Sequence, residues 1–245
     1  MNLRYALNAA LNFDEKEATK IIIISALSGF ILSFRKWGTE QFNASAGLTN
    51  LVSFSIMFLI LFFIFIYTQK VTAQLMGLDA KLHIWKYGPP IGVLVTIMSY
   101  GLIPFVFTGG VKLTEIPRLR LGKFKKTTIN IQEMLIIGLT GPLALIFLSL
   151  LVLFPLYQIS NNNIFLDMIW IVSIILLVCA IPLPSLNGLN LLLKYRSAWL
   201  IYTLFALLLY VLFALLKNPW IYSFSLILAI LFAWLIKLSV KDKYL

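Results

Sequence analysis

Long apolar runs constrain this chain more than any other feature of its sequence. Residues 51–67, LVSFSIMFLILFFIFIY, and residues 134–154, MLIIGLTGPLALIFLSLLVLF, approach or exceed the roughly 20 apolar residues that a spanning helix needs. Hydrophobic residues make up 61% of the chain, charged residues make up 12%, and the mean hydropathy is +0.96. We therefore predict an all-α polytopic membrane protein, because too few polar residues remain to cover a soluble domain.

The apolar runs predict about six spanning helices and one re-entrant segment, in a single membrane domain that covers residues 1–245. The re-entrant segment is residues 88–108, GPPIGVLVTIMSYGLIPFVFT, which is apolar but interrupted by glycine and proline. No linker or internal repeat divides the chain. The predicted spans are residues 18–36, 48–72, 133–157, 167–193, 199–216 and 220–237.

The distribution of charge predicts the orientation. The net charge is +11, and the basic segment 109–132 contains Glu115 as its only acidic residue before the next span begins, so we expect this segment to be cytoplasmic. A full crossing by residues 88–108 would place the N-terminus outside, whereas re-entry leaves few basic residues outside. We therefore predict a multi-pass protein of the plasma membrane with both termini in the cytoplasm. Its basic loops would contact anionic headgroups at that face, and we expect no nucleic-acid binding.

Two polar stretches lie at the ends of apolar runs. Thr68, Gln69 and Thr72 share one side of a helix, and Lys70 is directed elsewhere, toward the cytoplasmic interface. The predicted topology brings this stretch to the same depth as SLNGLN, residues 185–190, which contains Asn187. One interpretation of these residues is that they form hydrogen bonds that hold helices together.

Four motifs in sequence resemble the site-2 proteases, the intramembrane zinc metalloproteases. IFIYTQKVTAQLMGLDAKLHIWKYGPP is similar to the family's HExxH helix, PFVFTGGVKL to its re-entrant element, LTGPLALIFLSLL to its AGPxxN-type helix, and CAIPLPSLNGLNLL to its NxxPxPxLDG motif. The resemblance covers about residues 50–195 as a protease-like core, with accessory helices at 18–36 and 199–237. KYRSAW is similar to archaeal members. Gly138 and Gly141 are expected to let the third motif approach neighbouring helices closely.

The resemblance implies a catalytically degenerate member. Position by position, the family's two histidine ligands fall on Thr68 and Thr72, its glutamate base on Gln69, and its aspartate ligand on Asn187. Hydroxyls and carboxamides are poor zinc ligands, and glutamine cannot accept the proton of a metal-bound water. The chain has one histidine and one cysteine, too few to build a replacement site. We therefore expect no metal, no cofactor and no enzymatic activity.

The function predicted from this pattern is binding. A retained polar cleft would hold or regulate membrane-protein clients, or the chain would serve as a subunit of a membrane assembly. One alternative is a pathway for a small solute or ion through the cleft, and another is a residual intramembrane peptidase. Pro182 and Pro184 are expected to break the helix before Asn187. The residues predicted to line the cleft are Thr68, Gln69, Thr72, Pro182, Pro184, Asn187 and Asn190.

Overall fold

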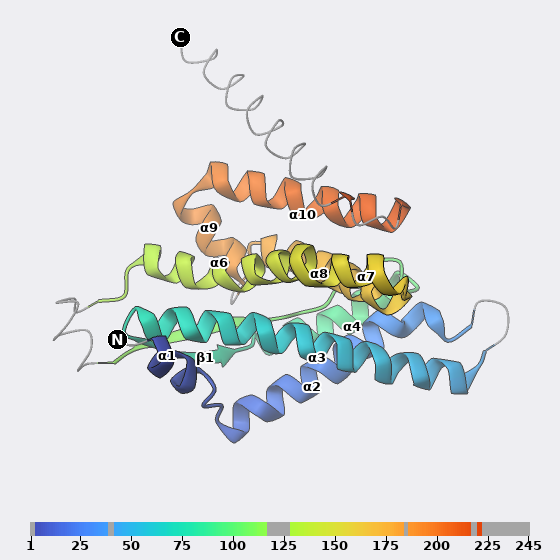
Figure 1. Ribbon diagram of the computed structural model, residues 1–245, viewed down its shortest axis with the longest axis horizontal. Coiled ribbons are helices and arrows are strands. Elements are labelled where there is room, and N and C mark those ends of the chain that lie inside the picture. The colour runs from blue at the N-terminus through green and yellow to red at the C-terminus, as the bar shows by residue number, and fades with distance from the viewer. Residues whose placement is uncertain (1–2, 39–41, 117–127, 184–185, 217–219, 222–245) are drawn as a thin grey trace, which may run out of the picture.

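The computed structural model describes residues 3–38, 42–116, 128–183, 186–216 and 220–221, and this part of the chain is mostly helical (Figure 1). Helix α6 continues through a π-helical turn, η3, into α7. The elements in chain order are α1 Leu3–Ala10, α2 Glu15–Ser33, η1 Phe34–Lys36, α3 Ala44–Leu75, β1 Leu78–His83, α4 Gly88–Met98, β2 Gly110–Glu115, α6 Ile131–Leu148, η3 Ser149–Leu153, α7 Phe154–Ser160, α8 Asn163–Ala180, α9 Asn187–Lys194 and α10 Arg196–Leu216.

Five of the helical stretches in the described residues are long and apolar enough to cross a membrane. Each overlaps a span predicted from the sequence, so the prediction of a largely α-helical membrane protein is supported at this level. The sixth predicted span, residues 220–237, lies almost entirely outside the described residues. The five candidate spans are Glu15–Lys36, Ala44–Leu75, Ile131–Ser160, Asn163–Ala180 and Arg196–Leu215.

Helix α3 lies at the centre of the molecule. It packs against α2 on one side and α6 on another, and α10 lies farther out against α8 and α9 (Figure 1). Phe54, Phe58, Phe62 and Phe65 follow each other at three- or four-residue spacing and are almost completely buried. This spacing places the four rings on one side of the helix, where they form much of the core.

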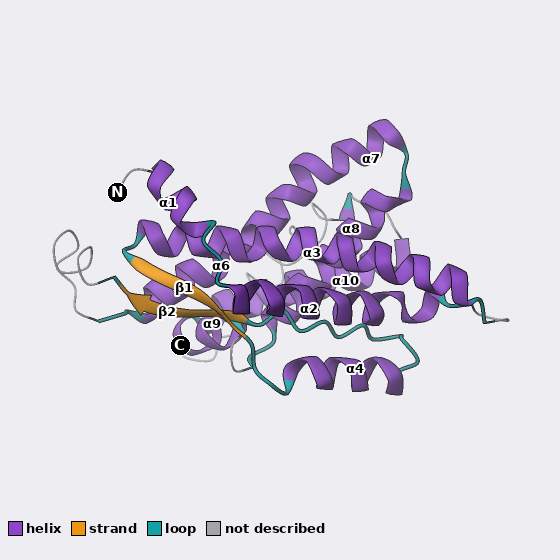
Figure 2. Ribbon diagram, turned by 90° about the horizontal axis from the view of Figure 1, so that it is seen from below, coloured by secondary structure: helices purple, strands orange, loops and turns teal. Residues whose placement is uncertain are grey.

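A small antiparallel sheet departs from the all-α prediction. Strand β1, LDAKLH, alternates buried with more accessible residues, as expected of a strand with one covered face, and it pairs with β2, GVKLTE. Figure 2 shows the two strands side by side near α2, and the sheet packs against α3. The prediction missed the sheet because both strands are short and lie among long apolar runs. His83 ends β1 and pairs with Gly110.

Residues 84–109 leave this sheet and return to it. The pairing of His83 with Gly110 holds the two ends of the segment together, as the re-entrant prediction requires. The chain goes out as α4, turns at Gly101 beside Arg35 at the far end of α2, and comes back extended (Figure 2). The returning residues 106–109 are buried, which is the condition under which non-helical backbone is tolerated at membrane depth.

The predicted span 167–193 is wrong as a single helix. Helix α8 ends at Ala180, and Ile181, which precedes Pro182, has an extended backbone with ψ 131°. A residue before proline disfavours the helical conformation, so the break follows from local sterics. Helix α9 then starts at Asn187 and packs closely on the end of α8, because Gly188 has no side chain to collide with the carbonyl oxygens of Ala180 and Ile181.

Candidate functional site

The candidate site is built around one backbone carbonyl in α6. Pro142 lies inside this helix and has no N–H, so the carbonyl oxygen of Gly138, four residues earlier, lacks its usual helical donor. Gly138 is buried. A buried carbonyl without a donor is unfavourable, and this one needs a partner from another element.

Two carboxamides from distant parts of the chain supply that partner. Gln69 Nε2 in α3 donates to the Gly138 oxygen at 3.2 Å, and Asn187 Nδ2 at the start of α9 donates to the same oxygen at 2.7 Å. The two predicted polar stretches therefore meet at one point. Their meeting point is a carbonyl of a third element, which was not predicted from the sequence.

Glycines in α6 make this approach possible, as predicted. A Cβ atom at position 138 would lie 2.7 Å from Asn187 Oδ1, and one at position 141 would lie 2.7 Å from Gln69 Nε2 and from the Phe65 ring. Real Cβ atoms essentially never approach other atoms this closely. Glycine at both positions is thus required by the contact of α6 with α3 and α9.

The two threonines do not take part in these interhelical bonds. Thr68 Oγ1 donates to the carbonyl oxygens of Ile64 and Phe65 at 3.0 Å, and Thr72 Oγ1 donates to that of Thr68 at 2.9 Å. Both side chains are half-buried. Their hydroxyl protons are committed to their own helix, so the threonines form the rim of the site and the carboxamides form its centre.

The remaining predicted cleft residues lie around the start of α9. Asn190 is half-buried and stands one turn after Asn187, and Pro182 is exposed in the connection after α8. Pro184 lies outside the described residues. We call the contact of Gln69, Gly138, Gly141 and Asn187 the α3–α6–α9 seam.

The seam is closed, and it contains one unsatisfied polar atom. Gln69 has no exposed surface, and its Oε1 atom has no hydrogen-bond donor among the described residues. The same carboxamide therefore donates through nitrogen to Gly138 and leaves its acceptor unused. An unpaired buried acceptor of this kind costs about 1–3 kcal/mol.

Lys70 points away from the seam, as expected, and it is buried in the protein, with 3% of its surface exposed. Its Nζ atom lies 2.9 Å from Glu17 Oε2, donates to the Asn12 carbonyl at 3.0 Å, and sits 3.9 Å above the centre of the Phe13 ring. This buried ion pair joins α3 to the start of α2.

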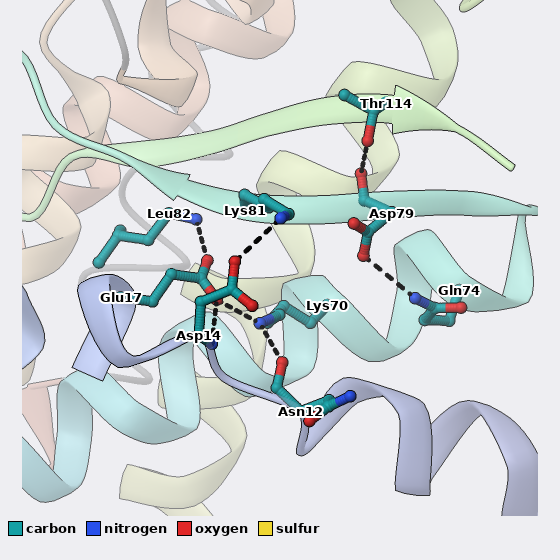
Figure 3. A network of polar contacts seen from close by, with 9 residues as sticks. All are labelled: Asn12, Asp14, Glu17, Lys70, Gln74, Asp79, Lys81, Leu82 and Thr114. Atoms are coloured by element: carbon teal, nitrogen blue, oxygen red, sulfur yellow. Dashed lines mark hydrogen bonds and ion pairs between the residues drawn. The ribbon is translucent and has the colours of Figure 1, made fainter.

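Glu17 connects the ion pair to the sheet (Figure 3). Its Oε1 atom accepts a hydrogen bond from the Leu82 backbone N–H at 2.6 Å, and it closes a capping box with Asp14 at the start of α2. The sequence contained the signal for the capping box, an aspartate followed three residues later by a glutamate. It gave no sign of Lys70 as the partner, because that contact spans 53 positions.

A second ion pair beside this network is exposed. Lys81 in β1 donates to Asp14 at 2.9 Å (Figure 3). The hydrogen bond and the positive charge of Lys81 lower the pKa of Asp14, and Asp14 in turn raises the pKa of Lys81. Both side chains are exposed, so this pair helps to orient β1 against the start of α2 but contributes little to stability.

The seam does not fit a catalytic zinc ion. Zinc needs imidazole, thiolate or carboxylate ligands, whereas the positions implied by the resemblance present two hydroxyls and two carboxamides that already hydrogen-bond to backbone carbonyls. No group of three or more histidine, cysteine, aspartate or glutamate side chains that could hold a metal ion is found in the described parts of the chain.

Comparisons with protein-family models, with curated proteins and with solved structures find no match for this chain.

Proposed function

We propose that this chain is a non-catalytic, site-2-protease-like membrane protein that binds membrane-protein partners. The partner is either a single-span client or another subunit of a membrane assembly. Support for the protease-like assignment comes from the four motifs in order and from the meeting of the first, third and fourth motifs at the Gly138 carbonyl. The charge distribution supports a plasma-membrane location with the N-terminus in the cytoplasm.

The observation that carries the proposal is the unused acceptor of Gln69. Its Oε1 atom is buried without a donor in the described structure, beside a carbonyl that has two donors. A partner helix that is locally unwound offers backbone N–H groups, which are donors of the required kind. Opening the seam toward such a segment would satisfy Gln69 Oε1, while Asn187 would keep the Gly138 carbonyl satisfied. The seam would thus bind an extended segment without cutting it.

Hydrolysis is less well supported by the same groups. A peptidase would need a bound metal with a general base, or an activated nucleophile with a base. Gln69 stands where the protease motif has its base, and a carboxamide does not take a proton from water. The solute-pathway alternative needs an open polar route, whereas Gln69 is enclosed between Phe65, Gly138 and Gly141.

Site-specific photocrosslinking in the native membrane tests the proposal. A photoreactive amino acid is placed at Thr72 or Asn190, which border the seam without donating to Gly138. Matched controls carry it at Ile56 and Phe147, which are 55% and 60% exposed on the outer surfaces of α3 and α6. We expect one and the same polypeptide to be captured from Thr72 and from Asn190, and not from the control positions.

Two results would overturn the proposal. If Thr72 and Asn190 trapped lipid alone, or the same polypeptides as the control positions, partner binding at the seam would be refuted. If elemental analysis of the purified protein gave one zinc per chain, lost on substitution of Asn187 by leucine, the peptidase alternative would replace it.

A further inference from the structure

A cavity of about 640 Å³ lies at the end of α2 that is farthest from the Lys70–Glu17 pair. The end of α2, the turn after α4, the start of α8 and the end of α10 enclose it. Its volume lies within the range of about 300–1,000 Å³ that is typical of small-molecule sites. The cavity shares no residue with the α3–α6–α9 seam, so a ligand bound in it would be independent of the proposed function.

The walls of the cavity are mainly apolar. These side chains belong to four different elements, so the apolar surface surrounds the space instead of forming one flat face. Trp170 and Tyr210 add rings that combine an apolar body with a polar atom, as is common near a membrane–water interface. The apolar walls are formed by Ile31, Leu32, Leu102, Leu166, Trp170 and Phe213.

Charge is concentrated at one side of this cavity. Lys36 is paired with Asp167 at 3.1 Å, and its Nζ atom lies 4.3 Å from the centre of the Phe54 ring. Arg35 also lines the cavity, but its side chain has no hydrogen bond or ion pair with any other described residue. Within the described part of the chain, this positive charge therefore has no counter-ion beside the apolar walls.

The turn after α4 holds Arg35 in place. Gly101 has φ +73°, a conformation that favours glycine, and a Cβ atom there would lie 2.6 Å from Arg35 Cγ. The stem of Arg35 thus packs against a backbone that has no side chain at this point. This contact places the stem of Arg35 beside the turn, while the residue as a whole remains exposed.

We propose that this cavity binds a phospholipid with an anionic headgroup. The guanidinium group of Arg35 would hold the phosphate through paired N–H donors, and an acyl chain would lie among the apolar walls. The Lys36–Asp167 pair would flank the headgroup. A lipid headgroup and free phosphate would both place a phosphate oxygen at Arg35. The apolar walls favour the lipid, because only a lipid also fills the apolar part of the cavity.

The purified full chain in detergent tests this proposal by native mass spectrometry. Phosphatidylglycerol and phosphatidylcholine with identical acyl chains are offered separately. Both lipids carry a phosphate, but the choline cation of phosphatidylcholine offsets its negative charge beside Arg35 and Lys36, so we expect phosphatidylglycerol to be retained preferentially. Arg35→Gln should reduce its retention about tenfold, as loss of a charged hydrogen-bonded contact implies. Lys20→Gln removes one exposed charge near the opposite end of α2 and should leave retention unchanged. Ala214→Trp, which fills the cavity, should reduce retention of both lipids.

Three outcomes would overturn the proposal. Equal retention of the two lipids by the wild type would remove the role of the headgroup charge. Equal effects of Arg35→Gln and Lys20→Gln would show only general attraction of anions to a basic protein. If inorganic phosphate alone displaced phosphatidylglycerol and Ala214→Trp had no effect, the site would bind a free anion and not a lipid.

Discussion

At the scale of single residues, Pro142 determines where polar side chains gather. By lacking an N–H, it leaves the Gly138 oxygen available, and Gln69 and Asn187 reach that oxygen from different elements. Membrane helices gain little from hydrophobic attraction to one another, so such bonds and close packing carry much of their association. Gly141 allows the helices to pack closely, and Pro142 leaves the Gly138 oxygen free to act as the acceptor.

The polar residues of this site could be found in the sequence, but their acceptor was missed. Gln69 and Asn187 stand out because carboxamides are rare in apolar runs. The four-residue spacing of Gly138 and Pro142 was a readable signal for a free carbonyl, but these residues were interpreted only as packing and motif positions. The roles of Thr68 and Thr72 could not be predicted, because a threonine hydroxyl can bond its own helix as easily as a neighbour.

Substitution of Gly141 by alanine tests the packing at this scale. In an isolated helix this change would stabilise by about 1 kcal/mol. Here we expect destabilisation by about 1–3 kcal/mol, because the new Cβ would overlap Gln69 Nε2 and the Phe65 ring. Reversible unfolding in mixed micelles measures the change. Gln69→Ala should relieve part of the cost in the double variant, and a stabilised Gly141→Ala protein would contradict the described contact.

At the scale of elements, α3 holds the molecule together through two adjacent residues that point in different directions. Gln69 faces α6, and Lys70 faces the start of α2 and, through Glu17, strand β1. Successive residues in a helix differ by about 100° in direction, so neighbours along the chain reach different elements. The polar end of this apolar helix thus anchors both sides of the fold.

Breaking the Lys70–Glu17 pair tests this role of α3. Both side chains are about 95% buried, so Glu17→Gln leaves a buried cation and should cost about 3–5 kcal/mol. Lys70→Met in the same protein removes that cation and should restore much of the loss. Lys36→Met breaks an exposed pair and should cost no more than about 1 kcal/mol. Unfolding in mixed micelles gives all these values; a Glu17→Gln cost as small as that of Lys36→Met would refute a buried pair.

The long helices could be predicted from the sequence better than the break after α8 or the sheet. Length and apolarity predicted the spanning helices to within a few residues at most ends, because a spanning helix must satisfy its own backbone in lipid. The break at Pro182 was predicted, but its consequence, two separate helices, was not. The sheet was missed because pairing of residues 78–83 with residues 110–115 depends on a long return of the chain that no local pattern reveals.

At the scale of the whole molecule, the fold places two distinct environments at opposite ends of α2. The Lys70–Glu17 pair and the sheet lie at one end, and the cavity beside Arg35 lies at the other. Residues 84–109 connect them, because this segment starts at the sheet and turns beside Arg35. No local pattern in the sequence indicates the contacts that join these two ends, which emerge only from the packed structure.

The central claim is that three distant motifs meet at the Gly138 carbonyl because Pro142 leaves it free. A double-mutant cycle of Gln69→Leu and Asn187→Leu, measured by unfolding in mixed micelles with and without Pro142→Ala, tests it directly. Either donor alone can satisfy the Gly138 carbonyl. We therefore predict that loss of both donors lowers the free energy of unfolding by about 1 kcal/mol or more beyond the sum of the two single changes. With Pro142→Ala, the restored N–H at position 142 serves the carbonyl, and this excess should disappear. Additive costs in both backgrounds would contradict the shared carbonyl.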